Sequence, residues 1–330
     1  MIKKITVLLL AVRITGIARA QFNAERDPIL THSLRSELIK KVFASTPGGS
    51  IMVTGISSGE SKLEVYAIPN GRNIASSKED IQKLLDENYE LNISITDNEL
   101  HVTAKSKNSF FKNNRLNISF KVFVPKNISV DLQTSGGSIS LSDLTGDEKF
   151  STSGGGLHLE NLQGTIKGGT SGGSIHAKNS SGDILLATSG GSLDIDGLKG
   201  IINASTGGGR INGNNIEGSF TAHTQGGSLS LQDIACSLDA STSGGGMRVI
   251  MKEFGKYVTL NNPGGNIYLL IPGAKGLNLK LHASKIDVDA LNNFNGSKKE
   301  DEITGTLNGG GIPVNVDTGR GSGRITLAFK

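Results

Sequence analysis

The 330-residue sequence has no tryptophan, only four tyrosines and a single cysteine, Cys236. One cysteine excludes an internal disulfide. We interpret it as a small buried residue at a corner of the fold, because no basic neighbour is evident that would activate its thiol. The scarcity of aromatic residues, together with 45 glycines, is typical of a thin, turn-rich β protein rather than of a compact enzyme.

An excess of charge is also missing from most of the chain. The formal net charge is +4, but Lys3, Lys4, Arg13 and Arg19 all precede residue 21, and the remaining basic and acidic groups balance. The basic surface of a nucleic-acid-binding protein is therefore not expected. No later segment approaches the ~20 consecutive apolar residues that a membrane-spanning helix needs. We expect neither a nucleic-acid partner nor a transmembrane segment in the mature chain.

Residues 1–20 have the features of a secretory signal peptide. Two lysines precede an apolar run at residues 5–12, and Ala18-Arg19-Ala20 supplies small residues for cleavage. No cysteine follows the run, so a lipoprotein anchor is not expected. We predict cleavage between Ala20 and Gln21 and export to the periplasm, the cell surface or the extracellular space.

The sequence is rich in one feature, a repeat of 18 residues. Units of the form T-S-G-G-S/G-I/L-x-L begin at Thr134, Thr152, Thr170, Thr188, Thr206, Thr224 and Thr242. The sixth position is always apolar and the eighth usually so, which marks one face of a strand. A second strand surrounds the fifteenth position, and glycines form the corners between the strands. One unit buries too little to be stable, so the units must stack as successive rungs of an all-β parallel β-solenoid with 18-residue coils.

Three other glycine-rich repeats fit less well. A calcium-binding β-roll needs aspartate where Gly154-Gly155-Gly156-Leu157-His158-Leu159 has leucine. A left-handed hexapeptide helix needs an apolar residue every six positions, and this unit has apolar residues at positions six, eight, eleven, fifteen and seventeen. Leucine-rich repeats lack the glycine pair. Calcium is therefore not expected as a cofactor, and no other cofactor is predicted.

The repeat divides the chain into parts. After the signal peptide we predict an N-terminal rung and capping region at residues 21–133, regular repeats at 134–261, and irregular C-terminal rungs with a cap at 262–330. Residues 56–130 are interpreted as an insertion that covers the first rung, because an open terminal rung invites edge-to-edge association. Within it we expect a strand at Lys62–Ile68 with a turn at Pro69-Asn70-Gly71, a helix capped by Ser77, and a hairpin of Leu91–Thr96 and Glu99–Lys105 around Asp97-Asn98.

The motif T-S-G-G-S-I-x-L with a following L-x-G, together with the closing segment Leu307-Asn308-Gly309-Gly310-Gly311-Ile312-Pro313, resembles the bacterial putative adhesin family, a domain-of-unknown-function group of exported β-solenoids. The resemblance runs from about Thr46 to Leu327. It implies the fold and an exported setting. It implies no catalytic residue, because the shared positions are structural glycines and core aliphatic residues.

Chemistry in a solenoid is expected as a row of side chains at one position of successive rungs. At the seventh position, His158, His176 and Asp194 should be neighbours about 5 Å apart. Two imidazoles and a carboxylate can bind a transition metal. The same residues also suit an ordinary polar strand face, and we predict no metal site.

Asp194 and Asp196 point outward two residues apart, a separation of ~7 Å that suits inverting glycoside hydrolysis. The repeats offer almost no outward aromatic platform for a sugar, however, and we predict no catalytic residue. We expect a non-enzymatic exported adhesion or interaction module at the cell envelope, whose partner is an unidentified protein or glycan. Alternatives are a carbohydrate-active enzyme on a β-helix and a periplasmic partner in envelope signalling.

Overall fold

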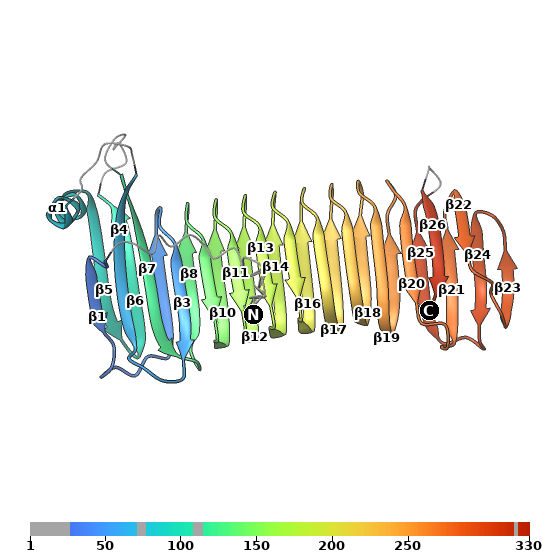
Figure 1. The fold of residues 1–330 in the computed structure, drawn as a ribbon, viewed down its shortest axis with the longest axis horizontal. Coiled ribbons are helices and arrows are strands. Elements are labelled where there is room, and N and C mark those ends of the chain that lie inside the picture. Colours follow the sequence, from blue (N-terminus) through green and yellow to red (C-terminus); the bar gives the residue numbers. More distant parts are fainter. Residues whose placement is uncertain (1–26, 71–76, 108–114, 320–322) are drawn as a thin grey trace, which may run out of the picture.

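The protein is a long rod of stacked β-rungs with a short helix at its N-terminal end (Figure 1). This computed structural model describes residues 27–70, 77–107, 115–319 and 323–330. Its strands pair in parallel with a shift of 18 residues, as between Leu193 and Ile175 or Ile184 and Ile166. The predicted parallel β-solenoid is therefore confirmed. The predicted signal peptide and its cleavage site at Ala20–Gln21 lie outside the described residues.

Each regular rung supplies a short strand at positions six to nine and a long strand at positions twelve to nineteen. These strands form two facing sheets, which we call the short-strand sheet and the long-strand sheet. Three strands near the C-terminal end run through the corner and belong to both sheets: β17 (Ile211–Thr224), β18 (Leu229–Thr242) and β19 (Met247–Asn261).

The short-strand sheet has the following spatial order: β1 (Leu30–Ser33), β4 (Lys62–Asn70), β7 (Arg115–Pro125), β3 (Ile51–Ile56), β9 (Ile139–Ser142), β11 (Leu157–Glu160), β13 (Ile175–Lys178), β15 (Leu193–Asp196), the first parts of β17, β18 and β19, then β20 (Ile267–Ile271), β26 (Arg324–Phe329) and β22 (Lys285–Val288).

The long-strand sheet has the following spatial order: β5 (Tyr89–Thr96), β6 (Glu99–Ser106), β2 (Lys41–Thr46), β8 (Ser129–Thr134), β10 (Thr145–Thr152), β12 (Gln163–Thr170), β14 (Ser181–Thr188), β16 (Lys199–Thr206), the last parts of β17, β18 and β19, then β25 (Ile312–Asp317), β21 (Leu277–His282), β24 (Glu302–Leu307) and β23 (Phe294–Lys298).

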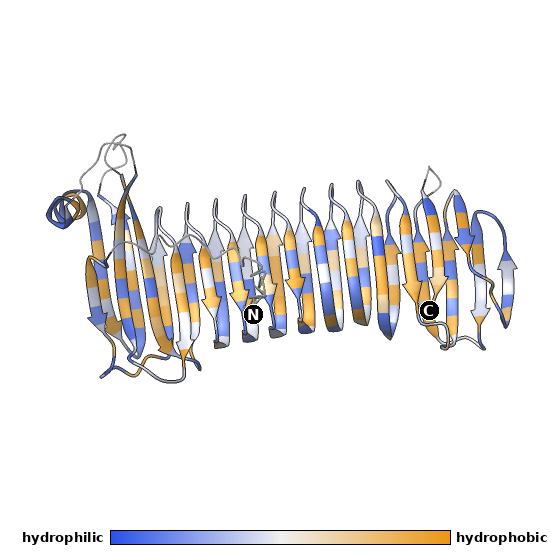
Figure 2. Ribbon diagram, in the orientation of Figure 1, coloured by the Kyte–Doolittle hydropathy of each residue, from blue (hydrophilic) through white to orange (hydrophobic). Residues whose placement is uncertain are grey.

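The core lies between the two sheets. Side chains alternate in hydropathy along the strands (Figure 2), and the apolar ones at positions six, eight, fifteen and seventeen are buried. Large and small residues complement one another across neighbouring rungs. A Cβ atom on Gly168 would lie 2.0 Å from the ring of Phe150, so the ring occupies the space that this glycine leaves. The core is thus filled to normal density without a uniform residue at each position.

The repeated threonine closes one corner of every rung. Its buried hydroxyl donates to a glycine carbonyl of the preceding rung and accepts from a glycine N–H of its own rung. For Thr188, Oγ1 lies 2.9 Å from the oxygen of Gly173 and 3.2 Å from the nitrogen of Gly191. The same donation recurs from Thr134 to Thr242 at 2.6–2.9 Å. The threonine row therefore links the rungs along the rod.

Glycine is favoured at two corner positions for different reasons; it is constant at the fourth position of the seven units, whereas Cys236 and Phe254 replace it at the thirteenth. At the fourth position the backbones of adjacent rungs touch: a Cβ atom on Gly191 would lie 1.9 Å from the carbonyl oxygen of Gly173. At the thirteenth position the backbone is left-handed, with φ of +128° at Gly182 and +124° at Gly200. The tenth position is left-handed as well, but Asn179 (φ 49°) and other short polar residues occupy it, and the sequence analysis did not single it out.

The N-terminal end is built from segments that lie far apart in the sequence. β2 and β3 form the predicted first rung, which stacks on β8 and β9, and β6 and β7 form one more rung beyond it. Antiparallel strands follow: β5 on β6, and β4 with β1 on β7. Figure 1 shows α1 (Lys78–Asn88) at this end of the rod.

Most of the local predictions in this region are confirmed. The hydroxyl of Ser77 accepts from the N–H of Asp80 at 3.1 Å and caps α1. Asp97 and Asn98 form the turn of the β5–β6 hairpin, with φ of 54° and 64°. The turn predicted at Pro69-Asn70-Gly71 is wrong in part, because β4 continues to Asn70 and Gly71 lies outside the described residues. β1 pairs with only the first four residues of β4. Pro69 lies beyond this pairing, so its missing N–H removes no hydrogen bond to β1.

The C-terminal end departs from sequence order. β25 inserts between β19 and β21, and β26 inserts between β20 and β22. The last rung of the chain therefore lies one rung inside the end of the rod. Antiparallel β24 and β23 extend the long-strand sheet beyond β21. No helix among the described residues is long and apolar enough to cross a membrane.

Candidate interaction face

The outer face of the short-strand sheet carries the predicted polar rows. β11, β13, β15 and β17 place His158, His176, Asp194 and Asn212 side by side at the seventh position. The side chains alternate with buried aliphatic residues, so the strand period alone directs them outward. Beyond β18 the same row continues with Arg248, Tyr268, Thr326 and Asp287. One continuous face thus changes from imidazole and carboxylate groups to arginine and tyrosine.

The two histidines stack instead of converging. The rings of His158 and His176 have centroids 5.4 Å apart and an interplanar angle of 26°. Two nitrogens that bind one zinc-like ion would lie roughly 3.4 Å apart. His176 Nδ1 is instead 3.4 Å from Asp194 Oδ2. No group of three His, Cys, Asp or Glu side chains within the described ranges converges on a metal-sized site, so the metal hypothesis gains no support.

His158 is the more enclosed of the pair. Its Nδ1 atom is buried and lacks a hydrogen-bond partner. Burial lowers the pKa of His158, and the neighbouring His176 lowers it further, because a second positive charge on the stack would be repelled. The pair therefore favours a neutral imidazole at His158, while His176 has a carboxylate partner in Asp194.

The two outward carboxylates are both held by amides of the next rung. Asn212 Nδ2 donates to Asp194 Oδ1 at 2.6 Å, and Asn214 Nδ2 donates to Asp196 Oδ1 at 2.8 Å. Asp196 and Asn214 are exposed, and Asp194 and Asn212 are half-buried. The structure thus confirms that the carboxylates are neighbours on one face. It also shows two parallel carboxylate–amide pairs, which sequence spacing alone does not predict.

A shallow groove follows these rows. One depression of about 300 Å³ is lined by side chains that include Asp194, Asp196 and Gln232. A second, of about 380 Å³, is lined by Arg248, Tyr268 and Arg324, among others. Ser230 lines both depressions, so they adjoin on the same face, and we call the two together the outer groove.

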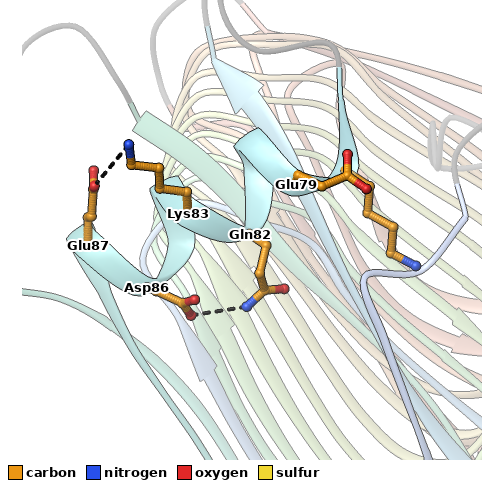
Figure 3. Close-up of a pocket in the computed structure, with 6 residues that line it drawn as sticks. Glu79, Gln82, Lys83, Asp86 and Glu87 are labelled. Atoms are coloured by element: carbon orange, nitrogen blue, oxygen red, sulfur yellow. Dashed lines mark hydrogen bonds and ion pairs between the residues drawn. The ribbon is translucent and has the colours of Figure 1, made fainter.

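A larger depression of about 660 Å³ lies over the exposed side of α1 and is lined only by helix residues (Figure 3). Gln82 Nε2 donates to Asp86 Oδ1 at 3.0 Å, and Lys83 Nζ lies 3.9 Å from Glu87 Oε1. These side chains bond along their own helix, as solvated i,i+4 pairs do. No second element among the described residues lines the depression, and we assign it no site.

Glu148 is a feature that the sequence analysis missed. It occupies the fifteenth position, where the following rungs have Ile166, Ile184 and Ile202, and its side chain is 1% exposed. Neither carboxyl oxygen has a hydrogen-bond partner within the part of the chain that the structure describes. Burial, and to a lesser degree Asp147, raises the pKa of Glu148 to about 8. A charged residue at an apolar position of the repeat was the available signal.

Cys236 is buried, as predicted. It pairs with Gly218 of the preceding rung. Burial raises the pKa of its thiol to about 12, so the reactive thiolate is disfavoured.

Comparison with known proteins places the chain in a family. The Toastrack DUF4097 family matches residues 49–327. The chain belongs to this family, which confirms the predicted membership of a domain-of-unknown-function family. Comparison with curated proteins gives no match.

Two solved structures are similar over most of their length. A putative cell adhesion protein from Clostridium sporogenes is 12% identical, with 91% of this chain and 98% of that chain covered and a TM-score of 0.22. A putative adhesin from Bacteroides fragilis is 14% identical, with 90% and 96% covered and a TM-score of 0.30.

Proposed function

We propose that this protein is a non-enzymatic, exported interaction module that binds an envelope or extracellular partner through the outer groove. The observation that carries the proposal is the pairing of its outward carboxylates. Asp194 and Asp196 each accept a hydrogen bond from an amide one rung along. A general acid and base need access to a proton and to a water, whereas two polar pairs held side by side between β15 and β17 present a preorganised binding surface.

The rod itself supports this proposal. Stacked rungs hold the rows of side chains at fixed spacing on a rigid sheet, so binding costs little ordering entropy. Family membership and the predicted signal peptide point to an extracytoplasmic setting. The partner is a protein or glycan of the envelope or its surroundings.

Export and binding are tested together in the native host. Cell fractions are probed for the protein, and its N-terminus is sequenced. We expect the protein outside the cytoplasm with Gln21 as its first residue, and the purified protein should bind isolated envelopes. A cytoplasmic protein that retains residues 1–20 would contradict the proposal.

The enzymatic alternative has a direct test. Release of reducing sugar from envelope and extracellular glycans is compared between the wild type and Asp194→Asn/Asp196→Asn. We expect no release from either protein. Release by the wild type that the double variant loses would replace the binding proposal with glycoside hydrolysis.

The signalling alternative is tested by pull-down from envelope extracts. Stable capture of a signalling protein, with no binding to whole envelopes stripped of protein, would favour a role as a periplasmic partner.

A further inference from the structure

Building on the proposed interaction function, we propose that the C-terminal half of the outer groove binds an acidic polysaccharide. In this half, Arg248 and Arg324 recognise the carboxylates of the polymer, and Tyr268 contacts a sugar ring. The proposal concerns the ligand class of the groove, which nothing in the family or in the similar structures specifies.

Arg248 is a cation prepared for an anionic ligand. Its guanidinium carbon lies 4.3 Å from the centroid of the Tyr268 ring. The side chain is exposed, and no carboxylate lies within ion-pair distance of it among the residues the structure describes. Stacking holds the guanidinium plane while its N–H groups remain available, the arrangement that favours two-point recognition of a carboxylate.

Arg324 adds a second, partly compensated cation. Arg324 is on β26, two strands along the short-strand sheet from β19, which carries Arg248. Both arginines line the same depression. Arg324 Nη1 is 3.3 Å from Asp287 Oδ2, and its side chain is 53% exposed. The ion pair orients the guanidinium and reduces its net charge. We therefore assign the larger contribution to Arg248.

The surrounding side chains suit sugar hydroxyls. Ser228, Ser230 and Thr326 line the depression around the arginines, and Asn212, Asn214 and Gln232 line its continuation. Hydroxyls and amides both donate and accept hydrogen bonds. Lys178, Asp194 and Asp196 line the far end. The two carboxylates outnumber the single lysine and accept only, so this end suits ligand hydroxyls and repels ligand carboxylates. Charge complementarity thus places the acidic groups of the ligand near Arg248.

The geometry favours a polysaccharide over an acidic peptide. β20 is bonded on one side to β19 and on the other to β26, so no strand edge is open for an extended peptide to join. Successive rungs are ~4.8 Å apart, which is close to the length of one sugar unit in an extended chain. Neighbouring sugars would therefore meet equivalent positions of neighbouring rungs.

The test is equilibrium binding of the full chain to polygalacturonate, to its carboxyl-reduced neutral polymer and to polyglutamate. We expect binding to polygalacturonate that weakens with salt, and at least tenfold weaker binding to the neutral polymer. Arg248→Ala should weaken binding roughly tenfold, and Arg324→Ala should weaken it less. Lys167→Ala removes an exposed cation from the outer face of the long-strand sheet and should change nothing.

Three results would overturn the proposal: equal affinity for the acidic and neutral polymers, equal or tighter binding of polyglutamate, or unchanged binding in Arg248→Ala. Envelope binding that survives Arg248→Ala and resists competition by polygalacturonate would reject the acidic ligand while leaving the interaction function intact. A protein that binds neither envelopes nor polygalacturonate would contradict both proposals.

Discussion

The interior rungs and the two ends of the rod use different strand arrangements. From β10 to β17, every strand has parallel neighbours related by 18 residues. At the ends, antiparallel strands and segments from distant parts of the chain take over. A parallel stack has no internal stop, because each rung leaves an edge that another can join. The comparison teaches that the repeat specifies extension, and that termination needs separate sequence.

The corners show the same contrast. In interior rungs a threonine hydroxyl donates to a carbonyl of the preceding rung and accepts from an N–H of its own rung. In the irregular part, Asn262 takes that place and donates to the oxygen of Gly245 at 2.8 Å, but its Oδ1 has no partner among the described residues. Within the same residues the buried hydroxyl of Thr318 also lacks a partner. The threonine hydroxyls of the interior corners are therefore bonded in the same way in every rung, whereas the corners near the C-terminal end leave polar atoms without a partner among the described residues.

The largest expected effect comes from breaking the 18-residue register of the interior. Deletion of Thr188–Asp196, nine residues, would direct polar residues inward where aliphatic residues must enter the core. Deletion of Thr188–Ser205 instead removes one whole rung and joins Ala187 to Thr206. We expect the first variant to unfold or aggregate, and the second to stay folded with a modest loss of stability. Circular dichroism and thermal melts distinguish them, and similar melts would refute a register-dependent interior.

The next effect separates two adjacent glycines of one corner. A Cβ on Gly191 would lie 1.9 Å from the oxygen of Gly173, whereas a Cβ on Gly190 would lie 3.7 Å from the oxygen of Ser171. We expect Gly191→Ala to destabilise the protein by about 3 kcal/mol or more, because two backbones must move apart. Gly190→Ala should cost less than about 1 kcal/mol. Denaturant melts of the pair measure the difference, and equal losses would mean that the rungs are not in contact there.

The interior was predictable because one constraint repeats. Apolar residues at two-residue spacing, glycine corners and a constant period are together compatible with few folds. Each further unit with the same pattern supports the same interpretation. The hairpin at Asp97-Asn98 and the helix cap at Ser77 were also predictable, since both depend on local backbone chemistry. The insertion of β25 between β19 and β21 was not, because it depends on pairing between distant segments.

The outer groove was predictable only in part. Row position alone placed His158, His176 and Asp194 together. It did not reveal the histidine stacking or the bonds from Asn212 and Asn214, since these depend on side-chain rotamers. Arg248 also occupies a seventh position of the repeat, but its contact with Tyr268 crosses into the irregular region, where the spacing between paired residues increases from 18 to 20.

Glu148 interrupts the apolar row of the interior, and its effect on the stability of the protein can be tested by varying the pH. Its pKa is raised to about 8 in the folded chain, so the folded state retains a proton that the unfolded state loses at a lower pH. The stability associated with this proton is fully present below the ordinary carboxyl pKa and is lost as pH rises through about 8. Glu148→Leu restores an apolar residue to the row. We expect it to stabilise the protein by about 3 kcal/mol at pH 8 and by much less at pH 5.

Glu148→Gln is the matched control, because it removes ionisation and keeps a polar group. Thermal melts between pH 5 and 9 should show a stability difference from wild type that grows with pH for both variants, with leucine the more stable throughout. If the stability difference between the wild type and Glu148→Leu does not change with pH, this carboxyl does not titrate in the core.

The smallest effect tests the hydroxyl that distinguishes interior corners from the C-terminal one. Thr224 is fully buried, and its Oγ1 lies 2.8 Å from the oxygen of Gly209 and 3.1 Å from the nitrogen of Gly227. Thr224→Val keeps the shape but leaves a carbonyl and an N–H without this partner, so we expect a loss of about 2 kcal/mol. Thr221→Val, on the exposed side of the same strand, should change stability by less than about 0.5 kcal/mol. Denaturant melts compare the two variants, and equal losses would mean that threonine is present for its strand propensity and not for its bonds between rungs.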